Sequence, residues 1–573
     1  MLTQTARRTS LWMATGVVPQ PGPLTSNIQA DVCVIGAGIA GLTTAHLLAR
    51  EGKLVALLDD GPVASGNTQF STAHLSNVFD DGFTRLERLH GPKGARTAAA
   101  SHAAAIDRIA SIVRLESIHC DFSRVDGYLF NPPGESRDFL DAELAAAKRA
   151  RVWGVETVAR APLGHFDTGA CLRFPGQAQF HPLRYAAGLV RAILRDGGRI
   201  FTETHATAIE GGNPAHVYTG AGPVVTADEI VMATNTPVDD RFMIHSKQAP
   251  YLSYVIGALI PRGSVPKALF WDTADPYHYV RVQPLSPSHV WAGDHGPGLH
   301  EVLLVGGEDH KTGQVNDQAE RYDRLEAWAR QRFPMIESVR FRWCGQIMRP
   351  VDGLGFIGRN PMDAPNVYVA TGDSGNGMTH GTLAGMILTD LIQGRRNTWE
   401  SLYDPSRKTL KAVGTFLRHN LSVLRQYGGW LTPGDVASAE ELAPDTGAII
   451  RRGLSKIAVY RDARGNLHQR SAVCPHLGAI VTWNQSDRTF DCPCFGSRFD
   501  CFGRVINGPA NQDLARLWDL EAPMHRPAPS PPPVMARLAD VLRFAPTYVS
   551  GSTSAATFCT RQPPEPAARR GKW

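Results

Sequence analysis

The chain has 573 residues, of which 43% are hydrophobic and 20% are charged, and its formal net charge is +5. This length exceeds what one compact core usually supports, so we expect roughly two to four domains. The composition is typical of globular proteins and excludes a mainly disordered or fibrous chain. A small net charge without any run of three Lys or Arg residues also disfavours a nucleic-acid-binding surface.

The N-terminus and the cysteines bear on the cellular compartment. Arg7 and Arg8 precede a mildly apolar stretch at residues 11–18, as in an export signal, but this stretch is short and runs into Pro19. No stretch reaches the roughly 18 apolar residues that a membrane span needs. The nine cysteines, four of them between residues 474 and 501, indicate a metal or redox site rather than a disulfide framework. We therefore expect a cytoplasmic protein without a membrane span.

The order of sequence patterns predicts the domain organisation. A long region alternates apolar runs with helical patterns, as in mixed α/β enzymes. After a helical segment at residues 409–427, the apolar runs become short and β-like, with Gly or Asp turns between them. A proline-rich stretch follows, which we expect to be mostly disordered. The predicted parts are an N-terminal extension (1–30), the α/β region (31–415), a linker (416–435), an all-β module (436–521) and a tail (522–573).

The segment ADVCVIGAGIAGLTTAHLLAREGKLVALLDDG is typical of a dinucleotide-binding site. An apolar strand leads into a glycine-rich turn, and a helical pattern and a second strand follow. Gly36 permits the tight turn, Gly38 lets the backbone approach a pyrophosphate, and Gly41 lets helix and strand pack closely. The helix N-terminus offers free N–H groups to the phosphates, and Asp59 ends the second strand where an acid binds ribose hydroxyls. The residues expected to contact the dinucleotide are Gly36, Gly38, Ile39, Ala40, Gly41, Asp59 and Asp60.

Three later segments identify the dinucleotide as FAD. PNVYVATGDSGNGMTHGTLAGMILTDLI (365–392), EIVMATNTP (229–237) and WCGQIMRPVDGLGFIG (343–358) resemble segments of the D-amino-acid-oxidase-like (DAO) flavoprotein superfamily. In the third, the arginine stands further along than in the family pattern. The alternative is an ordinary α/β core with repeated glycine turns.

The DAO resemblance implies a non-covalent FAD with the last helix N-terminus facing the flavin ring. Cys344 adjoins the position where some relatives attach the flavin covalently, but it is one residue out of register. The resemblance also implies FAD-binding segments near 31–90, 180–240 and 340–400, and a substrate domain from 90–180 and 240–340. The residues expected near the flavin are Gly372, Asp373, Gly375, Gly377, Met378 and Thr379.

The strand DPYHYVRVQP (275–284) is the most informative piece of the substrate half. Alternation places Tyr277, Tyr279 and Arg281 on one face and His278 on the other. Aromatic walls with a guanidinium suit an amine or amino acid whose carboxylate is bound bidentately. A half-buried strand with a solvated arginine is the alternative interpretation.

DAO-type chemistry moves a hydride from an amine-bearing carbon to the flavin, so the protein mainly orients the substrate and places charge. Lys311 resembles the lysine that flavin amine oxidases place near the flavin to favour reaction with oxygen. His74 and His380 flank the glycine-rich segments and either approach the flavin or serve as structural histidines. The candidate catalytic residues are Arg281, Lys311, His278 and His380.

The stretch CPHLGAIVTWNQSDRTFDCPCFGSRFDCFGRVINGPA resembles the two ligand loops of a Rieske [2Fe–2S] domain. In that family one iron takes two cysteines and the other takes two histidines. By position, Cys474 and Cys492 hold the first iron and His476 is half of the second site. Gly496, Ser497 and the strand around Phe499 match the surroundings that donate hydrogen bonds to the cluster.

Two departures put the cluster in question. Phe495 stands where the second histidine belongs, and a phenyl ring has no lone pair to donate. Ala479 replaces the cysteine that in many relatives pairs with the Cys494 position. The site is therefore empty, labile, or completed by the freed Cys494 thiol, and Cys501 is a remoter candidate. The candidate metal ligands are Cys474, His476, Cys492 and Cys494.

The whole arrangement resembles a bacterial group of two-domain FAD-dependent oxidoreductases. The expected fold is an α/β Rossmann-like FAD-binding domain with an α+β substrate domain, plus a small all-β Rieske-like domain. The resemblance implies a dehydrogenase or oxidase for an amine-like small molecule, with oxygen, a quinone or a redox protein as electron acceptor. The alternative is a flavin-binding protein whose cluster-free β module is an interaction domain. A Rieske oxygenase is excluded because only His525 follows the module, whereas a mononuclear iron site needs two histidines and a carboxylate.

Overall fold

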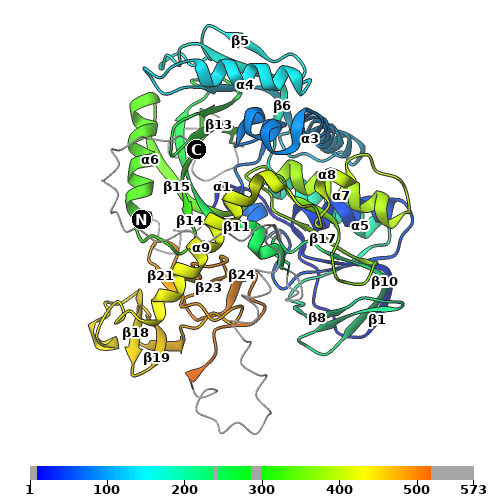
Figure 1. Cartoon of the computed structure of the whole chain (residues 1–573), viewed down its shortest axis with the longest axis vertical. Coiled ribbons are helices and arrows are strands. Elements are labelled where there is room, and N and C mark those ends of the chain that lie inside the picture. The colour runs from blue at the N-terminus through cyan, green and yellow to red at the C-terminus, as the bar shows by residue number, and fades with distance from the viewer. Residues whose placement is uncertain (1–8, 238–242, 286–298, 518–573) are drawn as a thin grey trace, which may run out of the picture. The chain divides into compact units, whose positions relative to one another are not determined.

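The computed structural model describes residues 9–237, 243–285 and 299–517. Within these residues the strands form four sheets, of eight, nine, three and four strands. The two large sheets belong to the predicted α/β region, and the two small ones to the predicted β module (Figure 1). The predicted disordered tail lies outside the described residues.

The first sheet has strand order β16-β17-β10-β1-β2-β7, with β8 and β9 attached through β10. The pairs β1–β10, β1–β2, β2–β7 and β10–β17 are parallel, as expected for a dinucleotide-binding sheet. Its strands are β1 (Ile28–Ile35), β2 (Val55–Leu58), β7 (Arg199–Phe201), β8 (Ala206–Glu210), β9 (Ala215–Thr219), β10 (Val224–Met232), β16 (Phe356–Arg359) and β17 (Val367–Thr371).

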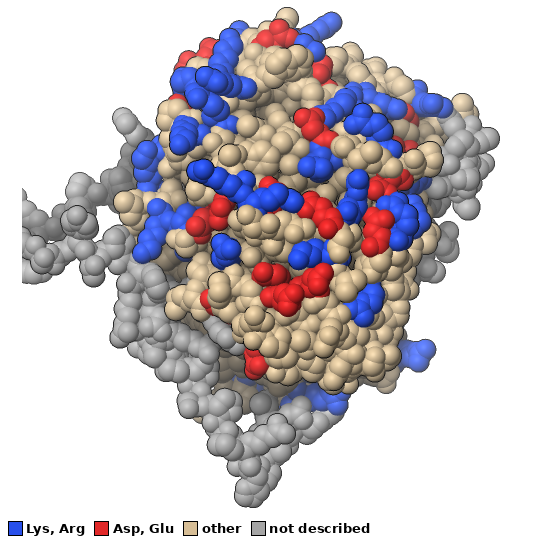
Figure 2. All heavy atoms as spheres, turned by 90° about the vertical axis from the view of Figure 1, so that its right-hand side faces the viewer, with Lys and Arg blue, Asp and Glu red and all other residues tan. Residues whose placement is uncertain are grey.

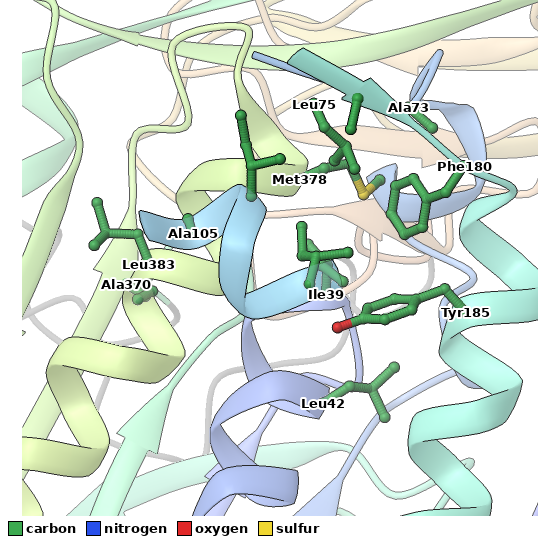
Figure 3. Close-up of a cluster of buried hydrophobic side chains, with 14 of the residues drawn as sticks. Ile39, Leu42, Ala73, Leu75, Ala105, Phe180, Tyr185, Ala370, Met378 and Leu383 are labelled. Atoms are coloured by element: carbon green, nitrogen blue, oxygen red, sulfur yellow. The ribbon is translucent and has the colours of Figure 1, made fainter. Parts of the chain in front are cut away.

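Helices α2 (Ile39–Arg50), α5 (Pro182–Arg195) and α7 (Gly377–Ile392) share one buried core with this sheet. Figure 3 shows part of this core, where Ile39 and Leu42 lie beside Tyr185 and Met378. Glycines let α2 and α7 approach closely: a Cβ on Gly381 would lie 2.6 Å from the Ile39 side chain. The N-termini of two helices from distant parts of the sequence therefore meet.

The second sheet carries the predicted substrate half. Its strand order is β15-β11-β14-β13-β12-β4-β6-β3, with β5 paired to β6. Helix α6 (Gln318–Arg332) packs on β11 and β14, while α3 (Gly82–Leu115) contacts α4 (Asp138–Arg149) and α7. The strands are β3 (His74–Leu75), β4 (Ser123–Phe130), β5 (Glu156–Val158), β6 (Cys171–Gln179), β11 (Gln248–Pro261), β12 (Leu269–Asp272), β13 (His278–Pro284), β14 (His300–Lys311) and β15 (Ser338–Pro350).

Part of the predicted N-terminal extension belongs to the core. Helix α1 (Leu11–Thr15) buries Leu11 and Trp12 completely. The Trp12 indole N–H donates to the Ser71 carbonyl at 2.6 Å, and the ring lies under the Arg281 guanidinium. A buried tryptophan with a satisfied N–H contributes large apolar area, so this segment helps to hold residues near Ser71 in place.

The β module follows helices α8 (Glu400–Tyr403) and α9 (Val413–Gln426). Val423 of α9 belongs to the hydrophobic core of the module, so the predicted linker is a packed helix in this part of the chain. The module strands, yellow to orange in Figure 1, are β18 (Thr446–Arg452), β19 (Ser455–Arg461), β20 (Leu467–Ser471), β21 (Thr482–Asn484), β22 (Thr489–Asp491), β23 (Arg498–Asp500) and β24 (Val505–Asn507).

The surface carries both signs of charge. On the face shown in Figure 2, Lys and Arg side chains are intermingled with Asp and Glu. In the described residues, no helix combines the length and the apolar character that a bilayer crossing demands.

Candidate functional site

The turn between β1 and α2 has the shape that a dinucleotide motif requires. Gly36 adopts φ +102°, and a Cβ there would lie 2.6 Å from the Ala233 carbonyl oxygen. A Cβ on Gly41 would lie 1.8 Å from the Gly36 carbonyl oxygen, so only glycine permits this helix to start so close to its strand.

Gly38 differs from the other two glycines of the motif, Gly36 and Gly41, because no neighbouring protein atom excludes a side chain at this position. Its φ is −77°, and the nearest atom to an added Cβ is the Thr68 hydroxyl at 3.4 Å, which is an ordinary contact. Gly38 is the N-cap of α2 and supplies no side-chain cap, and the Ile39 N–H donates to Thr68 Oγ1 at 3.0 Å. A bare backbone at a helix N-terminus fits a pyrophosphate.

The predicted ribose-binding acids lie beside this turn. Asp59 accepts hydrogen bonds from the N–H groups of Ala37 at 2.5 Å and Gly61 at 2.9 Å. Burial, together with the charge of Asp60, raises the pKa of Asp59 to about 7. Asp60 is exposed and lies 3.7 Å from the His205 ring, so Asp59 is the better placed of the two acids.

The second predicted segment forms a turn and the start of α7. Gly372 and Gly375 have positive φ, as a tight turn requires. Asp373 accepts a hydrogen bond from the Met348 N–H at 3.0 Å, which ties the turn to β15. Met378 and Thr379 are buried in the first turn of α7. The N-terminal ends of α2 and α7 lie together, and their dipoles favour negative charge at this place.

A group of charged and aromatic side chains lies next to this turn, and we name it the Asp80 cluster: Asp80, Tyr251, Tyr277, Asp309 and Arg349. Arg349 pairs with Asp309 at 2.8 Å and lies over the rings of Tyr251 and Tyr277. The Tyr277 hydroxyl donates to Asp309 at 3.2 Å and to Asp80 at 3.4 Å.

The Asp80 cluster touches the glycine-rich turn directly. A Cβ on Gly375 would lie 1.9 Å from an Asp80 oxygen, and both residues are solvent-accessible. Burial among protein atoms raises the pKa of Asp80 to about 7, with Arg349 opposing and Asp309 adding to the shift. Sequence reasoning missed Asp80 and Asp309. The family-like RP dipeptide at Arg349 was the available signal.

Arg281, predicted to bind a substrate carboxylate, is fully buried. Its guanidinium donates to the carbonyl oxygens of Thr72, Ala73 and Phe180 at 2.9 to 3.2 Å and also to the Gln283 side chain. These bonds leave only Nε without a partner among the described residues. The geometry therefore contradicts the predicted contact, because Arg281 holds backbone segments together in the core.

The predicted histidines have packed surroundings. The His278 ring Nδ1–H donates to the Asp272 carboxylate at 3.0 Å, and the ring stacks on Trp328. These contacts account for His278 as a structural residue on the far side of the sheet from Arg281. His380 in α7 is buried, and its ring fills the space beside Gly355. Burial lowers the pKa of His380 to about 4, so it is neutral at pH 7. A contact of His380 with the flavin stays a prediction.

Lys311, predicted to favour reaction with oxygen, ends β14 and pairs in register with Tyr251. Burial and the charge of Arg418 in α9 lower its pKa. The Lys311 ammonium group therefore lies near Arg418 of α9. A role of Lys311 beside the flavin stays a prediction.

The predicted metal ligands lie together in the β module. Cys474, Cys492 and Cys494 are buried and have free thiols. Hydrogen bonds from the thiols of Cys474 and Cys494 to the Cys492 sulfur lower the pKa of Cys492 well below its usual range. The His476 ring lies 5.5 Å from the Phe495 ring. Phe495 offers no donor atom, so the two loops supply three of the four expected ligands.

The donor chemistry fits an iron–sulfur cluster better than a single ion. In the described residues, no three His, Cys, Asp or Glu side chains converge as the ligands of one metal ion. A two-iron cluster needs only two protein donors on each iron, and buried thiolates beside an imidazole suit that arrangement. The fit is complete on the cysteine side and lacks one donor on the histidine side.

Strand β15 connects the two sites. Arg349 of the Asp80 cluster is three residues from Gln346, whose side-chain N–H donates to the Gly496 carbonyl at 2.7 Å. A Cβ on Gly496 would lie 2.3 Å from Pro250, so the second ligand loop packs tightly on β11 and β15. Cys344 donates to Asp487 at 2.8 Å, which adds a third contact.

Comparisons with known proteins agree with this geometry. The model of the DAO family (FAD dependent oxidoreductase) matches residues 31–391, and the model of the Rieske [2Fe-2S] domain matches residues 432–518. The chain belongs to the DAO family of FAD-dependent oxidoreductases. It carries a C-terminal Rieske domain, which confirms the predicted family and fold class.

Relatives share one or both parts of this DAO-family chain. A Bacillus subtilis (strain 168) protein named "Putative Rieske 2Fe-2S iron-sulfur protein YhfW" is 30% identical over 513 residues, covering 88% of this chain and 97% of that protein. Gamma-glutamylputrescine oxidoreductase of Escherichia coli (strain K12) is 26% identical over 419 residues, covering 68% and 92%. The structure of glycine oxidase from Geobacillus kaustophilus has a TM-score of 0.53 at 18% identity and covers 66% of this chain and 99% of that one, a likeness of fold.

Proposed function

We propose that this DAO-family oxidoreductase oxidises an amine at the Asp80 cluster and passes the electrons to its Rieske domain. The observation that carries the proposal is the shared strand β15, which holds Arg349 at one site and contacts the second ligand loop through Gln346. A substrate site and a Rieske ligand loop that share one strand suit electron transfer within the molecule.

The charges of the Asp80 cluster favour a cationic substrate. Asp80 and Asp309 outnumber Arg349, and Asp373 of the adjoining turn adds a third carboxyl group. Tyr251 and Tyr277 provide aromatic rings of the kind that bind ammonium groups. A relative that bears the name gamma-glutamylputrescine oxidoreductase supports an amine substrate, and Arg349 could bind a carboxylate on the same molecule.

FAD, held by the Gly36–Gly41 turn and the start of α7, would accept a hydride from the carbon that bears the nitrogen. The substrate ammonium must first lose a proton so that the nitrogen lone pair can form the new C=N bond. Asp80 is exposed, and the protein atoms packed around its carboxyl group raise its pKa to about 7, so its carboxylate can accept this proton. The products are an iminium ion and the reduced cofactor, and water then hydrolyses the iminium ion.

A substrate screen tests the amine assignment. Primary amines, diamines and amino acids are added anaerobically to the purified protein, and loss of the oxidised flavin absorbance is followed. We expect a subset of amines to reduce the flavin, whereas the hydroxy compounds with the same carbon skeletons do not. Reduction by the hydroxy compounds alone would contradict the proposal.

Paired variants locate the site. Asp309→Asn should raise KM for the amine by about tenfold, because one carboxylate of the Asp80 cluster loses its charge. The neighbouring Glu308→Gln is the matched control, since Glu308 pairs with Arg324 instead. Equal KM values in both variants would place the amine elsewhere. The reduced flavin is then reoxidised either by dioxygen or by a one-electron acceptor. We expect the reaction with the one-electron acceptor to be faster.

A further inference from the structure

A histidine of the FAD-containing part lies against the Rieske ligand loops. His245 belongs to the short helix η3 (Met243–Lys247), which directly precedes β11. Its ring centroid is 5.0 Å from that of His476, with an interplanar angle of 83°. The ring is also 6.5 Å from Phe495, so His245, His476 and Phe495 form one group of rings.

His245 has a donor set that the protein leaves unused. The residue is only 6% exposed, and neither ring nitrogen has a hydrogen-bond partner among the described residues. A buried polar group without a partner typically costs about 1–3 kcal/mol, so such groups in native proteins call for an explanation. A metal ion would satisfy one of the two nitrogens.

The spacing of the two imidazoles fits one shared metal ion. A metal–nitrogen bond of about 2.0–2.1 Å places each ring centroid about 3.2 Å from the metal. At a tetrahedral angle, two such centroids lie about 5.2 Å apart. The observed separation of His245 and His476 is 5.0 Å.

We propose that His245 is the fourth protein ligand of the Rieske centre and replaces the donor that Phe495 lacks. Cys474 and Cys492 would hold one iron, and His476 and His245 the other. The ligand set would then be two cysteines and two histidines, with one histidine from the FAD-containing part. This inference does not depend on the amine substrate.

Cys494 is the competing fourth ligand. Its thiol bonds to Cys492 and donates to the Val423 carbonyl of α9 at 3.7 Å, so it lies on the cysteine side of the site. His245 lies on the histidine side, against His476 and Phe495. The position of the missing donor therefore favours His245.

The full-length protein, purified anaerobically and reduced with dithionite, tests the ligand set. Wild-type protein labelled with 15N-histidine should give a pulsed EPR spectrum with couplings from two histidine nitrogens. His245→Cys should retain iron and show one coupling. A single coupling in wild-type protein, or the absence of iron and labile sulfide from it, would overturn the proposal.

Iron and sulfide assays on variants give an independent readout. Removing even an indirect partner of a metal typically lowers affinity about 10–100-fold, so His245→Ala should lose at least tenfold of its bound iron. Adding Phe495→His to His245→Ala should restore iron and the two couplings, because the donor returns on the ligand loop. This rescue also shows that loss of iron is not loss of folding.

Two matched variants complete the design. His419 is a second buried histidine, in α9, and His419→Ala should keep the iron. Cys494→Ser should also keep it. Loss of iron in Cys494→Ser with retention in His245→Ala would overturn the proposal and assign Cys494 as the ligand.

Discussion

The FAD-binding part and the Rieske domain assemble their sites in different ways. The residues of the phosphate turn and the acid at the end of β2 all lie within one continuous segment, from Gly36 to Asp59, although the turn packs against the backbone of Ala233. The Rieske loops keep Cys474, His476 and Cys492 but lack a donor at Phe495, and the best replacement is His245, more than 200 residues away in the sequence. A site built from neighbouring residues is complete in its motif, whereas a metal site can be completed by any residue that the fold brings near.

The largest effect should come from Arg281, which holds the FAD-containing part together without any role in the Rieske domain. Arg281→Lys should lower the free energy of unfolding by about 3 kcal/mol, because several buried carbonyl oxygens lose their donor. Urea denaturation followed by fluorescence measures this, with the exposed Arg342→Lys as control. An unchanged free energy of unfolding together with a raised KM for the substrate would instead support a role of Arg281 in substrate binding.

A second variant tests whether the nucleotide site is independent of the cluster. Gly38→Val should weaken FAD binding about 10–100-fold, since overpacking at a contact typically costs 1–3 kcal/mol. Flavin content is measured after acid release, and iron content should stay constant. Gly164→Val, where an added Cβ meets nothing within 4 Å, is the control. A Gly38→Val variant that retains the flavin content of wild-type protein would contradict the assignment of this turn as the nucleotide site.

The Asp80 cluster predicts a pH dependence that the Rieske domain should not share. With a pKa of about 7, Asp80 is neutral below this pH and charged above it, facing Asp81, Asp309, Asp373 and Arg349. A permanently charged probe such as benzyltrimethylammonium should therefore bind about tenfold more tightly at pH 8 than at pH 6.

The control for this pH dependence lies next to it in the sequence. Asp80→Asn should abolish the dependence, while Asp81→Asn, which removes a carboxylate paired with Arg85, should retain it. Affinity is measured by titration of the flavin spectrum with the probe. The same dependence in Asp80→Asn would assign the titrating group to another carboxylate.

The smallest effect concerns the contact between the two parts. Gln346→Ala removes the hydrogen bond to Gly496, worth about 1 kcal/mol, so amide exchange in the ligand loop should accelerate about fivefold. Gln485→Ala, on another loop of the Rieske domain, should leave that exchange unchanged. Identical exchange in both variants would mean that the loop is held by its own contacts alone.

Local patterns predicted the local structures well. Continuous apolar runs and glycine spacing identified β1, α2 and β2, and the DAO resemblance located β17 and α7. Both rest on residues that are adjacent in the sequence, so no tertiary information was required. The two Rieske loops were found for the same reason.

The errors arose where tertiary contacts decide. Alternation correctly placed Arg281 and His278 on opposite faces of β13. However, β13 lies between β12 and β14, and both of its faces are covered by protein. A pattern of alternation does not reveal whether a face is exposed to solvent or packed against a second core. Trp12 appeared to belong to an extension because a five-residue helix has too little periodicity to predict its burial. His245 carried no signal, since its partners lie in another domain.

The central claim is that the FAD-containing part both completes the Rieske centre and reduces it. The most direct measurement is an anaerobic reductive titration of wild-type protein with EPR detection. The account predicts that the chain takes up one electron beyond those of the flavin, with the spectrum of a histidine-ligated cluster that His245→Ala lacks. Full reduction of the flavin in wild-type protein without any cluster signal would contradict it.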